Sequence, residues 1–158
     1  MRRGGILASA TSLEEIFKVE ESNKVLLFSI KPKFSELIRA GVKTVELRKK
    51  KPKLVSGFAL IYESSPKKTI SFLVKIKKID CAPKGIVWKK YRKKCGITKK
   101  YFFDYYRGNR QGVAILIDRV IPLKKIISRE RLMRCNLAPP QDYRYATTEL
   151  LHNLMKSV

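Results

Sequence analysis

Short apolar runs separated by turn residues dominate the chain, and their pattern predicts strands. Residues 25–30, 58–62 and 111–120 are nearly continuous apolar runs rich in β-branched and aromatic side chains, which is typical of buried strands. Residues 44–48 and 70–79 instead alternate apolar and polar positions, as strands with one buried face do. The pattern therefore predicts about five strands between the first and the last of these runs.

Other apolar residues recur at helical spacing behind residues that favour helix starts. Pro32 suits the first turn of a helix, Thr98 is a suitable cap for another, and Ser12 with Glu15 has the spacing of a capping box. We expect helices over residues 32–40, twice within 84–107, after Thr147 or Thr148, and over 11–22.

Together these elements predict an α+β domain. The helices are too few, and too irregularly placed, for the strict alternation of a parallel doubly wound sheet. We therefore expect the strands to close into a small mixed or mostly antiparallel barrel of about five to six strands. Helices are inserted after the first strand and before the last one, and residues 139–145 are expected to be extended and irregular. We predict an N-terminal helical extension over 1–24, a domain over 25–145, and a C-terminal helix packed on it over 146–158.

Composition excludes several classes of protein. The 158 residues are 44% hydrophobic, enough for one domain with a sizeable core. No apolar run approaches the roughly 18 residues of a membrane-spanning helix, and the first ten residues lack the apolar stretch of a secretory signal. Cys81, Cys95 and Cys135 lie far apart without a CxxC pair, which argues against a zinc site or a disulfide framework. We therefore expect a cytoplasmic protein with no metal and no cofactor.

Charge indicates the kind of partner. The chain carries 36 Lys and Arg against 13 Asp and Glu, a net charge of +23. Residues 1–24 are neutral overall, whereas residues 43–100 hold nineteen basic residues and three acids, a net +16. So dense a positive field attracts polyanions and is more than solubility requires. The expected partner is a nucleic acid, either RNA or DNA.

Four sequence motifs stand in order along the predicted elements: LLFSIKP at 26–32, AGVKTVELRKK at 40–50, YESSPKK at 62–68 and APPQDYRY at 138–145. Together they resemble the ASCH family, which belongs to the PUA-like β-barrel superfamily. The segment at 97–115 also resembles the phenylalanine-rich helix that stand-alone members of the family have before their last strand. The resemblance implies a barrel with a cleft beneath its first helix, where the family is proposed to bind RNA or another nucleic acid.

The second predicted strand carries the main candidate residues. Glu46 and Arg48 share one face, so that Glu46 would accept a hydrogen bond from a base and Arg48 would contact a phosphate or a base edge. The alternative is a structural ion pair at the mouth of the barrel. Strict alternation places Lys43 on the opposite face, and it joins the same site only if a bulge or a turn, which Gly41 would permit, precedes the strand.

Several other residues are candidates for binding nucleic acid. We expect Tyr91 and Tyr106 to be exposed among basic residues and to stack on unpaired bases. The Ser64–Ser65 turn is a candidate for holding a phosphate at the rim, with an ordinary turn as the alternative, and Gln141, Tyr143 and Arg144 either line the cleft or seal the barrel. The expected phosphate contacts are Lys31, Lys49, Lys50, Lys51, Lys53, Lys89, Lys90, Arg92, Lys93 and Lys94.

The resemblance leaves three functional hypotheses open. The favoured one is an RNA-binding module without catalytic activity that acts in RNA metabolism or gene regulation. The second hypothesis is an enzyme that uses Lys43 and Glu46. Some relatives are acetylcytidine amidohydrolases, but Glu46 stands where their nucleophilic threonine would be. Bacterial relatives have also been credited with ribonuclease activity. The third is a structural component of a ribonucleoprotein whose residues 12–21 dock a protein partner.

Overall fold

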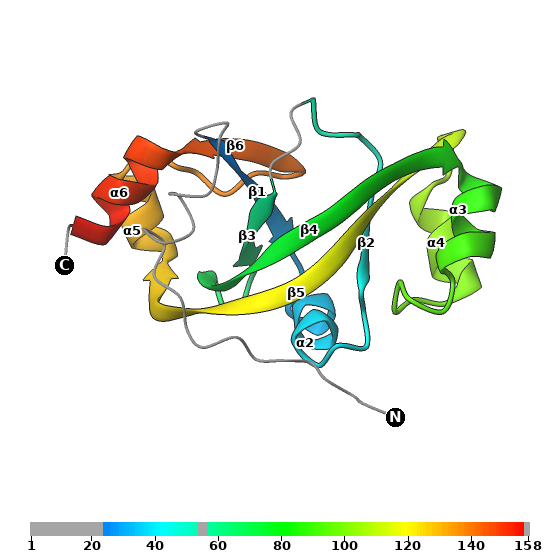
Figure 1. The fold of residues 1–158 in the computed structure, drawn as a ribbon, viewed down its shortest axis with the longest axis horizontal. Coiled ribbons are helices and arrows are strands. Elements are labelled where there is room, and N and C mark those ends of the chain that lie inside the picture. The colour runs from blue at the N-terminus through cyan, green and yellow to red at the C-terminus, as the bar shows by residue number, and fades with distance from the viewer. Residues whose placement is uncertain (1–23, 54–56, 157–158) are drawn as a thin grey trace.

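Six strands form one sheet at the centre of the molecule (Figure 1). The computed structural model describes residues 24–53 and 57–156. The sheet has the strand order β2-β5-β4-β3-β1-β6. Its strands are β1 (Lys24–Ile30), β2 (Val45–Arg48), β3 (Phe58–Glu63), β4 (Thr69–Pro83), β5 (Gln111–Ser128) and β6 (Tyr143–Thr147).

Strand pairing confirms the mixed, mostly antiparallel architecture. β1 and β3 are parallel, and every other neighbouring pair is antiparallel. Within the part of the chain that the structure describes, β2 and β6 are the two edges and do not pair with each other. The six-stranded α+β fold is therefore as expected, but the sheet is open and closure into a barrel is not confirmed.

The hairpin of β4 and β5 is longer than the sequence predicted. β4 continues beyond residue 79 to Pro83, and β5 continues beyond residue 120 to Ser128. Register shifts along this pair are irregularities of the β-bulge kind, which allow so long a hairpin to bend. Figure 1 shows α3 and α4 at one end of the hairpin, and α5 and α6 at the other end of the molecule.

The helices begin largely where the sequence predicted, and one was missed. Pro32 opens α2, the Thr98 side chain accepts a hydrogen bond from the Tyr101 backbone in α4, and Thr147 caps the last helix. The unpredicted helix is α5, which follows the cap residue Ser128. In the described residues the helices are α2 (Pro32–Arg39), α3 (Lys84–Tyr91), α4 (Lys99–Tyr105), α5 (Arg129–Arg134) and α6 (Thr148–Lys156).

Residues 143–147, within and just beyond the stretch expected to be irregular, form strand β6 because their backbone groups pair with β1. The helix predicted over 11–22 lies outside the described residues. No helix in the described ranges is long and apolar enough to cross a membrane.

Alternation along β1 builds apolar layers on both faces of the sheet. Val25 and Leu27 pack in a cluster with residues of α5, α6 and the neighbouring strands. Leu26 and Phe28 point to the opposite face, where Ile38 of α2 packs. A third cluster joins α3 and α4 to β2 and β5. The same strand therefore holds α2 on one face and the C-terminal helices on the other.

A buried carboxylate fixes α2 to the sheet. Glu63, at the end of β3, is 1% exposed and accepts hydrogen bonds from Ser35 Oγ of α2 at 2.7 Å and from Ser71 Oγ of β4 at 2.9 Å. Arg39 and Lys67 form ion pairs with the same carboxylate at 2.9 and 3.4 Å. Burial alone would raise the pKa of Glu63, but these hydrogen bonds and cations outweigh it and lower the pKa below its ordinary value. The network sets the position of α2 over β3 and β4.

Candidate functional site

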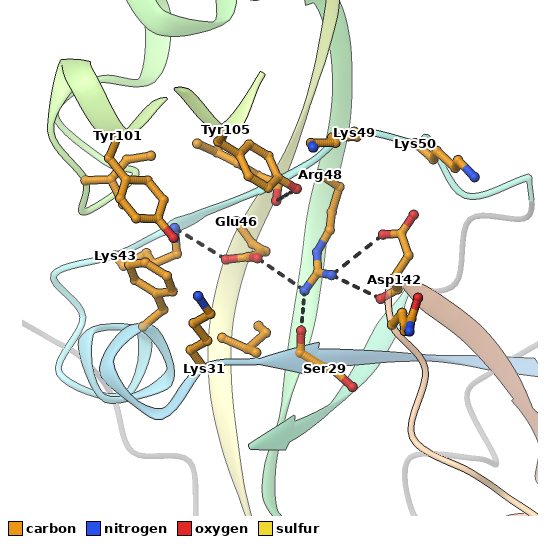
Figure 2. Close-up of a pocket in the computed structure, with 15 residues that line it drawn as sticks. Ser29, Lys31, Lys43, Glu46, Arg48, Lys49, Lys50, Tyr101, Tyr105 and Asp142 are labelled. Carbon is orange, nitrogen blue, oxygen red and sulfur yellow. Dashed lines mark hydrogen bonds and ion pairs between the residues drawn. The ribbon is translucent and has the colours of Figure 1, made fainter. Parts of the chain in front are cut away.

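A pocket of about 450 Å³ opens between α2, β2 and α4 (Figure 2). Elements far apart in the sequence contribute to it, including the end of β1 and the segment before β6. Five basic and two acidic residues line it, so its walls carry a net positive charge. Its lining consists of Ser29, Ile30, Lys31, Phe34, Lys43, Glu46, Leu47, Arg48, Lys49, Lys50, Ile97, Tyr101, Tyr105, Gln141 and Asp142.

The floor of the pocket is a row of three charged residues. Glu46 lies between Lys43 and Arg48: its Oε2 is 3.3 Å from Lys43 Nζ and its Oε1 is 3.2 Å from Arg48 Nη2. Lys43 and Arg48 are 3% and 6% exposed, and the Glu46 side chain is 13% exposed. The predicted pairing of Glu46 with Arg48 on one face is thus found, as an ion pair that faces the pocket.

Lys43 reaches this row because a turn precedes β2. Gly41 has a φ of +72°, in the left-handed region that glycine adopts without strain. The chain then folds so that Lys43 Nζ also donates to the Cys95 carbonyl at 2.6 Å. Gly96 completes the fit, since a Cβ there would lie 3.2 Å from Lys43 Cβ. The condition set by the sequence, a turn at Gly41, is met.

Arg48 holds several parts of the pocket together. Its Nη2 donates to the Ser29 carbonyl of β1 at 2.9 Å, and its Nη1 donates to the Asp142 carbonyl before β6 at 3.0 Å. Its guanidinium also lies over the Phe28 ring, 4.8 Å from the centroid. Of the nitrogen atoms of this guanidinium, the buried Nε has no hydrogen-bond partner in the described residues. Most of the guanidinium is therefore occupied by the protein itself.

Aromatic side chains that the sequence analysis missed form a wall of the pocket beside this row. Tyr101 and Tyr105 come from α4, and Phe34 of α2 meets Tyr101 edge-on at 5.6 Å between ring centroids. Burial raises the pKa of Tyr105 to about 12, so its phenol remains protonated at neutral pH. Helical spacing was the available signal, because Tyr101 and Tyr105 are four residues apart and so lie on one face of α4.

The expectation that Tyr91 and Tyr106 are exposed is wrong. Tyr106 is fully buried and its hydroxyl donates to the Arg48 carbonyl at 2.9 Å. Tyr91 is 8% exposed and its hydroxyl donates to Asp80 Oδ2 at 2.7 Å. Basic neighbours in sequence suggested exposure, but helical periodicity turns both rings into the cluster between α3, α4 and the sheet. Neither ring is available to stack on a base.

The predicted phosphate contacts fall into two groups. Lys31, Lys49 and Lys50 are exposed and line the pocket; we call these three residues the mouth lysines. The others lie outside the pocket lining, all are exposed, and Lys90 pairs with Asp80 at 3.1 Å. This second group comprises Lys51, Lys53, Lys89, Lys90, Arg92, Lys93 and Lys94.

Of the remaining candidate residues, one lines the pocket and the others lie outside it. Gln141 lines the pocket. Tyr143 packs against the apolar cluster on the α2 face of the sheet, and exposed Arg144 donates to the Ala138 carbonyl at 2.9 Å. Ser64 and Ser65 form a turn outside the pocket lining, where the Ser64 backbone donates to the Ile30 carbonyl at 3.0 Å.

The pocket lining has the groups to bind an anion and a flat ring. Within residues 24–53 and 57–156, no group of three or more His, Cys, Asp or Glu is placed to hold a metal ion. The pocket instead offers cationic hydrogen-bond donors, one carboxylate between them, and rings suited to stacking on a flat ligand. That combination fits an anionic ligand with a flat ring.

Known proteins resemble the chain in sequence and in fold. The family model described as the ASCH domain matches residues 28–118. The ASCH domain-containing ribonuclease of Zymomonas mobilis is 25% identical over 134 residues, which are 84% of this chain and 90% of that protein. The crystal structure of ASCH from Zymomonas mobilis has a TM-score of 0.77 and 25% identity, covering 85% of this chain and 96% of that one. The resemblance found in the motifs is confirmed, and the chain belongs to the ASCH domain family.

Proposed function

We propose that this protein binds RNA, with one nucleotide in the pocket and the adjoining backbone along the mouth lysines. The observation that carries the proposal is the pocket itself, which combines buried cationic donors, an aromatic wall and exposed lysines at its opening. Its volume of about 450 Å³ is in the range of small-molecule ligand sites. The Z. mobilis relative named as a ribonuclease supports RNA over DNA as the partner.

Different parts of the site would bind the phosphates of the RNA backbone and the base of the nucleotide in the pocket. Exposed lysines neutralise phosphates and carry no sequence information, which suits the mouth lysines. Unpaired bases in RNA commonly stack on aromatic side chains, which suits Tyr101, Tyr105 and Phe34. Basic residues outside the pocket, such as Lys51 and Lys93, extend the positive surface for further phosphates.

Replacing the three mouth lysines together by glutamine should weaken RNA binding about tenfold or more, because three phosphate contacts are lost. The matched control replaces Lys77, Lys124 and Lys125, three exposed lysines outside the pocket lining. Fluorescence anisotropy with a labelled single-stranded RNA measures both variants, and a DNA of the same sequence serves as competitor. Equal losses in both variants would show that binding is diffuse and does not use the pocket.

RNA cleavage is the second candidate, favoured by the name of the Z. mobilis relative and by the Lys43–Glu46 pair. In this alternative a phosphate, not a base, lies against the floor. The ribose 2′-hydroxyl attacks phosphorus and gives its proton to Glu46, the P–O5′ bond breaks, and Lys43 donates a proton to the leaving oxygen. The products are a 2′,3′-cyclic phosphate and a 5′-hydroxyl.

Cleavage by this route should disappear in Glu46→Gln while affinity for RNA persists. The amide keeps the size of the side chain and cannot take the proton. Gel analysis of end-labelled RNA detects the cyclic-phosphate product, and Glu36→Gln, an exposed carboxylate of α2 outside the pocket lining, is the control. Turnover that survives in Glu46→Gln contradicts this route, and no turnover by the native protein leaves RNA binding as the function.

A further inference from the structure

The row of Lys43, Glu46 and Arg48 has hydrogen-bond donors and acceptors that the protein itself does not use. A lysine ammonium has three N–H groups. In the described structure Lys43 uses two on the Cys95 carbonyl and Glu46, and its Nζ also lies over the Phe34 ring, 5.6 Å from the centroid. Arg48 has an unpartnered Nε–H. In a guanidinium the Nε–H shares an edge with one Nη group, and the Nη2 of Arg48 reaches Glu46. Lys43 and Arg48, the two cations that flank Glu46, therefore each keep one N–H that no polar group accepts in the described structure.

Glu46 provides the acceptor between these donors. A carboxylate has about four lone-pair sites, and the structure gives each Glu46 oxygen one cationic partner. Figure 2 shows Lys43, Glu46 and Arg48 in a row. The row thus presents a donor, an acceptor and a donor. A ligand that bonds to all three would also satisfy the buried Arg48 Nε, which is costly to leave without a partner.

We propose that this row recognises the imide edge of uracil. Its O4, N3–H and O2 are an acceptor, a donor and an acceptor, which is the complement of Lys43, Glu46 and Arg48. Cytosine and adenine place an amino donor against one of the cations, and guanine matches only part of the row. The inference rests on the proposed function and deepens it: the nucleotide bound in the pocket is an unpaired uridine.

The burial of the site places the base, not a phosphate, against the row. The row is largely buried whereas the mouth lysines are exposed, so the ligand is deepest at the row. A base is a side group of the RNA chain and can enter while the backbone remains outside. An internal phosphodiester is flanked by two sugars, and both would have to enter with it. Tyr101 and Tyr105 on the adjacent wall are then placed to contact the uracil ring.

Ligand variants test the inference with the native full-length chain. Fluorescence anisotropy at low salt compares adenylate octamers that carry one central uridine, cytidine or N3-methyluridine. We expect the uridine octamer to bind at least about tenfold more tightly than the cytidine octamer, since matched polar contacts to a base edge discriminate by factors of this size. N3-methyluridine, whose N3 cannot donate, should bind as weakly as cytidine.

A protein variant tests whether the row of Lys43, Glu46 and Arg48 recognises the uracil base. Lys43→Met removes one donor and should abolish the preference for uridine over cytidine. Lys51→Met, which removes an exposed charge outside the pocket lining, should weaken both octamers and keep their ratio. Should Lys43→Met fail to fold, the N3-methyluridine comparison still decides.

The outcomes separate this inference from the proposed function. Equal affinities for the three octamers, or a uridine preference that survives in Lys43→Met, overturn the recognition of uracil while RNA binding stands. Failure of every octamer to bind at low salt refutes RNA binding itself. Inorganic phosphate that displaces the uridine octamer at concentrations too low to act through ionic strength would show that the row holds phosphate, and that result also overturns the inference.

Discussion

The affinity of this protein for single-stranded RNA should fall about 300-fold between 50 and 200 mM salt. Binding that neutralises about six phosphates releases the counterions condensed on them, and this release is less favourable when the salt concentration rises. The chain has ample charge for six contacts, since residues 43–100 alone carry a net +16 and the mouth lysines are exposed beside the pocket. The electrostatic share of the binding energy should therefore be large.

A titration series at four or five salt concentrations gives the slope of log affinity against log salt. The variant without the mouth lysines should give a slope shallower by about two, because each phosphate contact on a single strand contributes roughly 0.7. A glutamine variant of one mouth lysine alone should fall in between. An affinity independent of salt would contradict the view that the positive surface is there to bind a polyphosphate.

Replacing Arg48 by methionine should lower the free energy of unfolding by about 3 kcal/mol, since breaking a buried ion pair leaves groups without compensation. Arg48 is 6% exposed and holds the Ser29 carbonyl, the Asp142 carbonyl and Glu46. Methionine fills similar space and supplies no donor for any of them. The segment before β6 would lose its attachment to β1 at this point, so the pocket should also lose its shape.

Urea denaturation followed by circular dichroism measures the effect. Arg119→Met, at an exposed position of β5, is the matched control and should change stability by less than about 0.5 kcal/mol. Arg48→Lys keeps the charge but not the planar fork, and should fall between the two variants. A stable Arg48→Met protein would mean that the contacts of Arg48 do not hold the site together.

The local pattern of apolar, polar and helix-starting residues was enough to predict much of the fold. Alternation and apolar runs located the strands, and Pro32 and Thr98 marked helix starts that the structure confirms. Strand ends were less predictable: β4 continues through Asp80–Pro83 and β5 continues past Pro122, because each strand supplies the other's hydrogen bonds. β6 was missed for the same reason, since its partner β1 lies more than a hundred residues earlier.

The candidate site was predicted in part. The spacing of Glu46 and Arg48 placed them on one face, and the turn at Gly41 that brings Lys43 beside them was identified as the necessary condition. The aromatic residues were chosen wrongly. Tyr106 and Tyr91 face the core, whereas the pocket wall uses Tyr101 and Tyr105, because the side of α4 that meets the sheet depends on how the helix packs.

The amino-acid sequence by itself determined the family, the order of most strands and helices, and the excess of positive charge, since each of these depends on residue type and short-range spacing. Only the tertiary structure decided which charges form a row, which lysines stand at the mouth and which rings face the pocket. Those properties arise where β1, β2, α2, α4 and the segment before β6 meet, and distances between such segments are fixed by packing.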